Sequence, residues 1–257
     1  METTPANKPK VNLPANPKVN PKVNPKVNPK VSPKVNPENK PKPRSHAKSQ
    51  VQKSISLPIT EKLLTLAIDD VEGALPASLK TTLRFGLAGA LLAELTLANR
   101  IQLGQDHSVH ADPAESGDTL FDDILVMITA EKKPRKLGHW VQAIGSKLTI
   151  KQVAGRLVQH KVIALEKKRY SWVIPYEAFP QVQASAKYSV KQHLRGIVLT
   201  GELVDAPDIT LLSLLKACGL LRLVFTRDER KAADRKVNAL VQGEVLGEAV
   251  AKLLAKK

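Results

Sequence analysis

The sequence predicts a mainly helical fold with one or two short β-hairpins. The longest apolar stretch, residues 77–99, is apolar nearly all round at helical spacing, which is typical of a central core helix. Helical periodicity also fills the chain after Pro180. The segments 162–166 and 170–174 look like two strands joined across three basic residues, and this pattern favours a hairpin.

The individual elements follow from periodicity and from helix-breaking residues. Thr60 is placed to cap the first helix, and Gly73 and Pro76 separate that helix from the second. The polar residues 104–117 predict a loop. We expect helices at 57–71, 77–99, 119–129, 137–144, 150–158, 184–199, 208–225, 229–241 and 244–254, and a further short strand at 100–103.

Composition divides the chain into a basic arm and a folded domain. Residues 1–52 are predicted to be a disordered basic arm, and residues 56–257 a globular domain. Residues 17–36 read Pro-Lys-Val-Asn five times, with Ser32 replacing one asparagine, and predict a loose polyproline-II-like segment. The arm is either a solvated linker or an electrostatic tether, and the second reading rests on the repeat lysines Lys18, Lys22, Lys26, Lys30 and Lys34.

No catalytic chemistry is indicated. Gly86 and Gly89 lie in an apolar helical pattern and favour close helix packing over a phosphate-binding loop. His107 and His110 favour a solvated loop over a metal site, and Cys218, the single cysteine, is expected to be a small buried residue. We therefore predict a protein that is not an enzyme and has no cofactor and no metal.

The charge indicates an anionic partner. The formal net charge is +16, which suits nucleic acid or an acidic membrane. The apolar run 87–98 is too short to span a bilayer and contains Glu94, so membrane contact is expected to be peripheral.

Two groups of basic residues are candidates for binding an anion. On the long helix, Lys80 and Arg84 are four residues apart, and they share one face with Ala88, four residues further on. A second group follows at Lys147, Lys151, Arg156, Lys161, Lys167, Lys168 and Arg169. These residues either converge on a phosphate or are scattered solvated charges.

A nucleic-acid-binding reading also exists. Residues 137–174 combine two helices with a two-stranded wing, which resembles a winged helix-turn-helix. A winged-helix-like nucleic-acid-binding protein with a basic arm is therefore the alternative function.

Several segments together resemble one family. The run Ile-Thr-Glu-Lys-Leu-Leu-Thr-Leu-Ala-Ile-Asp-Asp-Val-Glu-Gly at 59–73 is similar to the opening helix of the Golgi phosphoprotein three family. Residues 86–103 resemble its central helix and following strand, and 117–125 and Trp140 match two further segments. The resemblance continues through 208–220 and 230–254.

The resemblance implies both a fold and a function. The implied fold is a helical bundle core wrapped by amphipathic helices, with a projecting hairpin that supports self-association. The implied function is a cytoplasmic, peripheral membrane adaptor that binds phosphatidylinositol 4-phosphate in a shallow basic pocket, on Golgi membranes in animals and yeast. There it binds enzyme tails and coat proteins.

The family's pocket residues are only partly present. A tryptophan position falls on Leu79, and three arginine positions fall on Ala88, Lys151 and Ala154. The predicted headgroup-binding residues are Arg84 and Lys151, with Lys80 and Arg156 as supporting charges. The expected partners are anionic membrane lipids, with phosphatidylinositol 4-phosphate implied by the resemblance, and a second copy of the chain in a homo-oligomer. No specific nucleic acid is expected.

Overall fold

The computed structural model describes residues 57–112, 115–170 and 174–256. Backbone contacts divide the chain into two units, Met1–Val51 and Gln52–Lys257, and the architecture below concerns the second. The repeat segment and its lysines lie outside the described residues.

The described residues are mainly helical and carry two small antiparallel sheets, which confirms the predicted fold class. The helices are α1 Ile59–Ala67, α2 Ala77–Leu97, α3 Thr119–Thr129, α4 Leu137–Lys147, α5 Ile150–Gln159, α6 Ala184–Arg195, α7 Ala206–Ala217, α8 Arg230–Leu240 and α9 Val245–Leu254. The strands are β1 Ile101–Leu103, β2 Ser108–Ala111, β3 Arg135–Lys136, β4 Glu166–Tyr170 and β5 Ile174–Ala178. A π-helical turn, Gly196–Thr200, continues α6, and a 3-10 turn, Leu221–Leu223, follows α7.

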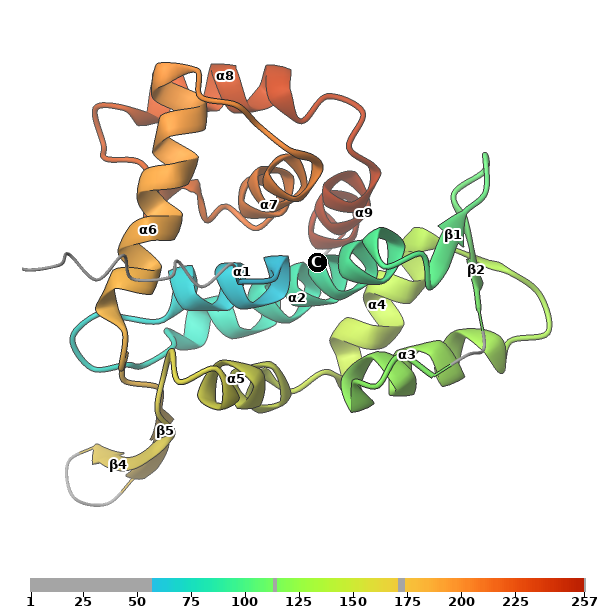
Figure 1. Ribbon diagram of the computed structural model, residues 1–257, viewed down its shortest axis with the longest axis horizontal. Helices are drawn as coiled ribbons and strands as arrows, with labels where there is room; N and C mark the ends of the chain where they lie inside the picture. The colour runs from blue at the N-terminus through green and yellow to red at the C-terminus, as the bar shows by residue number, and fades with distance from the viewer. Residues whose placement is uncertain (1–56, 113–114, 171–173, 257) are drawn as a thin grey trace, which may run out of the picture. The chain divides into compact units, whose positions relative to one another are not determined.

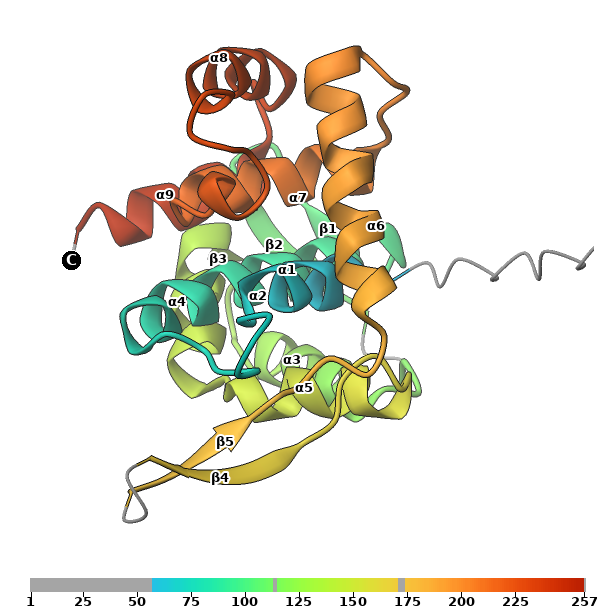
Figure 2. The same ribbon diagram turned by 90° about the vertical axis from the view of Figure 1, so that its left-hand side faces the viewer.

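Helix α2 is the centre of the bundle. It runs through the middle of the domain with α1, α4, α7 and α9 packed around it (Figures 1 and 2). Leu83, Leu87 and Leu91 on this helix are fully buried, because neighbours cover it on nearly every side. A Cβ atom on Gly89 would lie 2.8 Å from Leu214 Cδ2, so this glycine allows α7 to pack closely.

The two sheets lie at the periphery. Strands β1, β2 and β3 form one antiparallel sheet, and β4 pairs with β5 as a hairpin that projects from the helices (Figure 2). The strands predicted at 162–166 and 170–174 are thus shifted along the chain by about four residues. The reason is that Val162 and Ile163 are buried in the core before the hairpin begins, and Ile163 forms an isolated bridge with Gln181 just after the hairpin ends.

Other boundaries also differ from the prediction. Pro58, not Thr60, precedes the first turn of α1, and Thr60 is buried inside that helix. Helix α7 ends at Ala217 because the backbone turns at Gly219, which has a φ of +65°. Strand β2 lies within the segment predicted to be a loop. Val109 is the one buried apolar side chain of this strand, so the sequence has no alternating apolar pattern here that would predict a strand.

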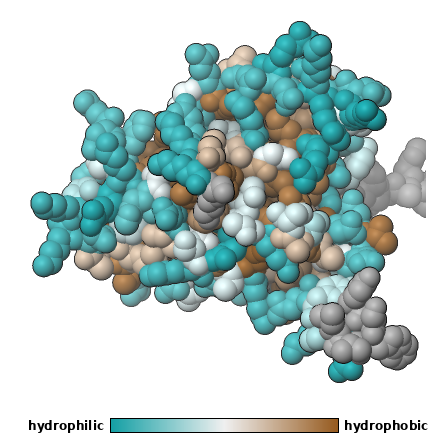
Figure 3. All heavy atoms as spheres, turned by 180° about the vertical axis from the view of Figure 1, so that it is seen from behind, coloured by the Kyte–Doolittle hydropathy of each residue, from teal (hydrophilic) through white to brown (hydrophobic). Residues whose placement is uncertain are grey.

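Hydrophilic residues dominate the outer edges of the face in Figure 3, and apolar residues show between them in the middle. Among the described residues, no helix combines the length and the apolar character needed to cross a bilayer.

Candidate functional site

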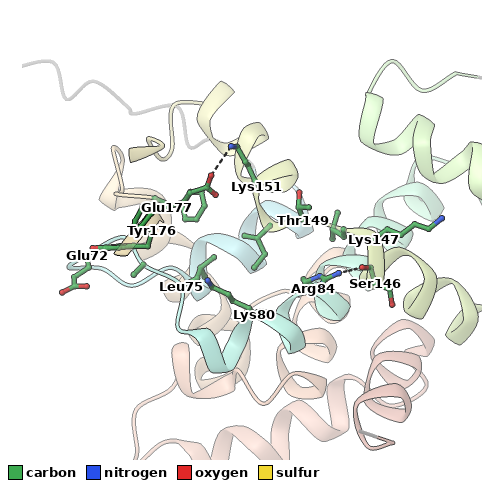
Figure 4. A pocket seen from close by; sticks show the side chains of 15 residues that line it. Glu72, Leu75, Lys80, Arg84, Ser146, Lys147, Thr149, Lys151, Tyr176 and Glu177 are labelled. Carbon is green, nitrogen blue, oxygen red and sulfur yellow. Dashed lines mark hydrogen bonds and ion pairs between the residues drawn. The ribbon is translucent and has the colours of Figure 1, made fainter. Parts of the chain in front are cut away.

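A basic groove lies where α2, the α4–α5 connection and the β4–β5 hairpin meet. Its volume is about 990 Å³. The groove is lined by Glu72, Ala74, Leu75, Lys80, Arg84, Ser146, Lys147, Leu148, Thr149, Ile150, Lys151, Pro175, Tyr176, Glu177 and Phe179 (Figure 4). Its cations therefore come from three helices, and it also has apolar walls.

Local sequence explains how α2 and α4 approach each other. Lys80 and Arg84 are one turn apart on the first half of α2. Gly145 on α4 packs against α2 at Arg84 and Phe85, and a Cβ atom there would lie 2.5 Å from Phe85 Cδ1 and 3.3 Å from the Arg84 carbonyl oxygen. The absence of that side chain lets α4 come close enough for Arg84 Nη2 to donate a hydrogen bond to the Ser146 carbonyl.

The first turn of α5 forms one wall of the groove. Thr149 and Gln152 form a capping box, in which each side chain bonds the backbone of the other residue. The cap fixes where α5 begins, so Thr149, Ile150 and Lys151 all line the groove. The first amides of a helix have no partner within it and carry partial positive charge, so this wall favours an anion.

The four groove cations differ in how they are held. Half-buried Arg84 is tied to Ser146, and Lys151 Nζ lies 3.1 Å from Glu177 Oε1. Within the described part of the chain, Lys80 and Lys147 form no ion pair. In Figure 4 the Lys147 ammonium points away from the other three cations. The groove thus has two uncommitted cations and two that are anchored to the protein.

Arg156 does not line this groove. Its Nε lies 3.4 Å from Glu61 Oε1 and 3.6 Å from Asp118 Oδ2. Its Nη2 lies 3.6 Å from Glu94 Oε2, and its guanidinium lies 4.8 Å from the centre of the Phe121 ring. The α5 face that carries Arg156 packs against α1, so this predicted supporting charge joins α1, α2 and α3 instead.

Two of the three carboxylates around Arg156, those of Glu61 and Glu94, are at most 10% exposed, whereas Asp118 is 31% exposed. Glu61 is fully buried, and its Oε2 also lies 2.8 Å from His160 Nδ1. Burial raises the pKa of Glu94, while hydrogen bonds from Thr60 and the charge of Arg156 oppose that rise. The cluster is therefore an interior ion-pair network with a structural role.

The structure brings together three of the four predicted site residues, Lys80, Arg84 and Lys151, and separates them from Arg156. The site selection missed Lys147, although it belongs to the same basic run, four residues before Lys151. It also missed Glu177, which lies 26 residues after its partner Lys151 and carries no local sequence signal.

The positions that resemble the family's other pocket residues are buried here. Leu79, Ala88 and Ala154 are at most 8% exposed, and none of them lines the groove. Ala88 therefore extends the core rather than the cationic face of α2. Lys151 is the one position of these four that presents a cation to the groove.

Histidine, serine and cysteine side chains outside the groove are the candidates for other chemistry. Among the described residues, no group of histidine, cysteine and carboxylate side chains has the arrangement of a metal site. Ser108 Oγ and His110 Nε2 lie 3.1 Å apart on the exposed surface. Burial raises the pKa of the Cys218 thiol to about 12, so this sulfur has little thiolate character.

Comparison with known proteins gives one family match. The profile of the Golgi phosphoprotein 3 (GPP34) family matches residues 59–256 and confirms the resemblance found in the sequence. A search of curated proteins found no match.

Proposed function

The chain belongs to the Golgi phosphoprotein 3 family, and we propose that it is a non-enzymatic peripheral membrane adaptor that binds a phosphoinositide headgroup in the basic groove. The family resemblance favours phosphatidylinositol 4-phosphate as the lipid. One observation carries the proposal: Lys80, Arg84, Lys147 and Lys151 line a single open groove beside the first turn of α5.

Phosphate chemistry fits this arrangement. A phosphomonoester presents three acceptor oxygens and a charge of about −1.5 to −2 at neutral pH. Arginine and lysine donate charge-assisted hydrogen bonds to such oxygens, and a helix N-terminus supplies further donors. The groove is open to solvent, so a headgroup can enter while its lipid remains in the bilayer.

The groove cations have different roles in the proposed complex. Lys80 and Lys147 can turn toward the ligand without breaking an ion pair. Lys151 must leave Glu177, and Arg84 keeps its bond to Ser146 while offering its remaining donors. Lys80 can therefore contact the headgroup without the cost of breaking an ion pair, whereas Lys147, which points away from the other cations in Figure 4, must first turn toward the ligand.

The proposed membrane attachment is peripheral. In a eukaryotic cell it would lie on the cytoplasmic face of Golgi membranes, with protein partners bound elsewhere on the domain. The basic arm would add electrostatic attraction of about 1 kcal/mol for each lysine near an anionic surface, reduced by salt. The arm thus gives general attraction, and the groove gives lipid preference.

The test is vesicle flotation of the full chain. Phosphatidylcholine vesicles with and without phosphatidylinositol 4-phosphate are compared at physiological ionic strength. Lys80→Ala and Lys151→Ala should each weaken lipid-dependent binding by roughly tenfold, since one charge-assisted hydrogen bond is worth about 1.5–3 kcal/mol. Lys231→Ala is the matched control, because Lys231 is an exposed cation on α8 and lies outside the groove.

Arg84→Ala should weaken binding similarly, and a thermal melt separates that effect from the lost bond to Ser146. If the lysine variants bind like Lys231→Ala, the groove is not the headgroup site. A sequence-specific DNA complex at physiological salt that survives removal of residues 1–50 would support the winged-helix alternative instead.

A further inference from the structure

The groove contains a carboxylate that is already paired with one of its cations. Glu177 Oε1 lies 3.1 Å from Lys151 Nζ, and the two side chains are 41% and 58% exposed. Figure 4 shows Glu177 reaching from the hairpin toward Lys151, with Tyr176 beside it. An acidic side chain inside an anion-binding groove opposes the binding of anions, so Glu177 affects which anions the groove accepts.

The position of Glu177 is set by the residues that follow it. Ala178 and Phe179 are buried, and the Phe179 amide donates to the Gly73 carbonyl oxygen at 2.7 Å. In β5, Glu177 pairs with Lys167 of β4. The hairpin base is therefore held against the α1–α2 loop, and the carboxylate is kept within reach of α5.

The charges that line the groove sum to a small positive value. Its four cations, Lys80, Arg84, Lys147 and Lys151, stand against two carboxylates, Glu72 and Glu177. In Figure 4 the Glu72 carboxylate lies at the outer end of the groove and points away from the cations. Glu177 is therefore the acidic residue whose charge a bound headgroup would meet directly.

Building on the proposed headgroup site, we propose that Glu177 is a specificity-determining residue that limits the groove to headgroups with one phosphomonoester. A single dianionic phosphate matches the excess of two cations over carboxylates in the lining. A second phosphomonoester adds about two further negative charges, and these meet the Glu177 carboxylate. Repulsion grows with ligand charge, so Glu177 disfavours doubly phosphorylated headgroups more than singly phosphorylated ones.

The ion pair with Lys151 acts differently. Any anion that uses Lys151 must first displace Glu177, and this competition lowers the affinity of all such ligands by a common factor. Glu177→Gln removes both effects. The variant should therefore bind every phosphoinositide more tightly, and its gain should be largest for the more highly charged lipids.

Glu166 provides a matched control on the same hairpin. It is 51% exposed, pairs with Lys168 Nζ at 3.7 Å, and does not line the groove. Glu166→Gln makes the same change in net charge as Glu177→Gln. A nonspecific electrostatic effect on membrane binding would therefore appear in both variants.

The experiment compares the full chain and both variants on vesicles containing phosphatidylinositol 4-phosphate or phosphatidylinositol 4,5-bisphosphate. Glu177→Gln should raise the affinity for both lipids and shift the ratio toward the bisphosphate by about three- to fivefold, an effect that salt reduces. Glu166→Gln should leave the ratio unchanged. Calorimetric titration with glycerophosphoinositol 4-phosphate and glycerophosphoinositol 4,5-bisphosphate, which keep the phosphodiester at position 1, should show the same shift without a membrane.

The outcomes separate the two proposals. If the wild type binds and Glu177→Gln leaves the ratio unchanged, or if Glu166→Gln shifts it equally, the role of Glu177 is refuted while the headgroup site stands. If neither the wild type nor Glu177→Gln binds any of these ligands, the headgroup site itself is refuted, and the role of Glu177 falls with it.

Discussion

Replacing Arg156 by methionine should destabilise the domain without removing a groove cation. The Arg156 side chain is 16% exposed, and its guanidinium faces Glu61, Glu94 and Asp118. Methionine keeps an aliphatic stem of similar length but lacks the guanidinium. Glu61 is fully buried, so the substitution leaves a buried carboxylate with His160 as its nearest remaining partner. Removing one partner of a buried ion pair costs about 3–5 kcal/mol.

The lower end of that range applies here, because His160 still contacts Glu61 and the Thr60 amide still donates to Glu94. We expect a loss of about 3 kcal/mol in the free energy of unfolding. For a domain of this size, such a loss lowers the melting temperature by roughly 6–12 °C. Urea denaturation and a thermal melt of the full chain measure both quantities.

The loss should also depend on pH. Burial already raises the pKa of Glu94, and removal of Arg156 takes away one of the influences that oppose this rise. A carboxyl group with a raised folded-state pKa contributes stability at low pH and loses that contribution as pH increases through the folded pKa. The variant should therefore be closest to wild type under mildly acidic conditions and should fall further behind as pH increases.

Two controls make this reasoning refutable. Glu61→Gln combined with Arg156→Met should recover part of the lost stability, because the buried carboxylate is then neutral. Lys151→Met should leave the free energy of unfolding nearly unchanged, since that lysine is 58% exposed. A loss below about 1 kcal/mol for Arg156→Met would show that the network is not structurally important. If Arg156→Met binds the headgroup more weakly but is as stable as the wild type, Arg156 belongs to the lipid-binding site as the sequence predicted.

Three further predictions concern other parts of the chain. Arg195 holds the pKa of Glu229 at about 2, so stability that is present above the ordinary value of 4.5 should be lost as pH falls toward 2. Glu229→Gln should flatten that acid dependence in denaturation curves, and an unchanged acid limb would contradict the assignment. Gly89→Ala should cost about 1–3 kcal/mol, because its Cβ atom would lie 2.8 Å from Leu214 Cδ2; a stabilised variant in a thermal melt would disprove this packing. Deleting residues 1–50 should weaken flotation with anionic vesicles at low salt and matter less at high salt, whereas unchanged flotation at low salt would remove the tether reading.

Local sequence determined the elements whose signals lie within a few residues. The helix predicted at 119–129 has the observed bounds of α3, and the apolar stretch 77–99 became the central helix α2. Both are set by side chains three or four positions apart, which is the range that periodicity and capping report. Lys80 and Arg84 could be assigned to one face for the same reason, and the family followed from several such segments in order.

Tertiary structure decided which cations meet. Lys151 and Arg156 lie five positions apart on α5, and nothing in the sequence separates them. In the structure Lys151 lines the groove, whereas Arg156 pairs with Glu61, 95 positions earlier. The hairpin carboxylate Glu177 reaches Lys151 only because β5 is held at its base against the α1–α2 loop. Ion pairing across distant elements depends on how helices pack, and helix packing depends on close approaches such as that at Gly145. No local pattern in the sequence encodes those distances. Tertiary structure therefore decides which cations line the groove and places Glu177 where it competes for Lys151.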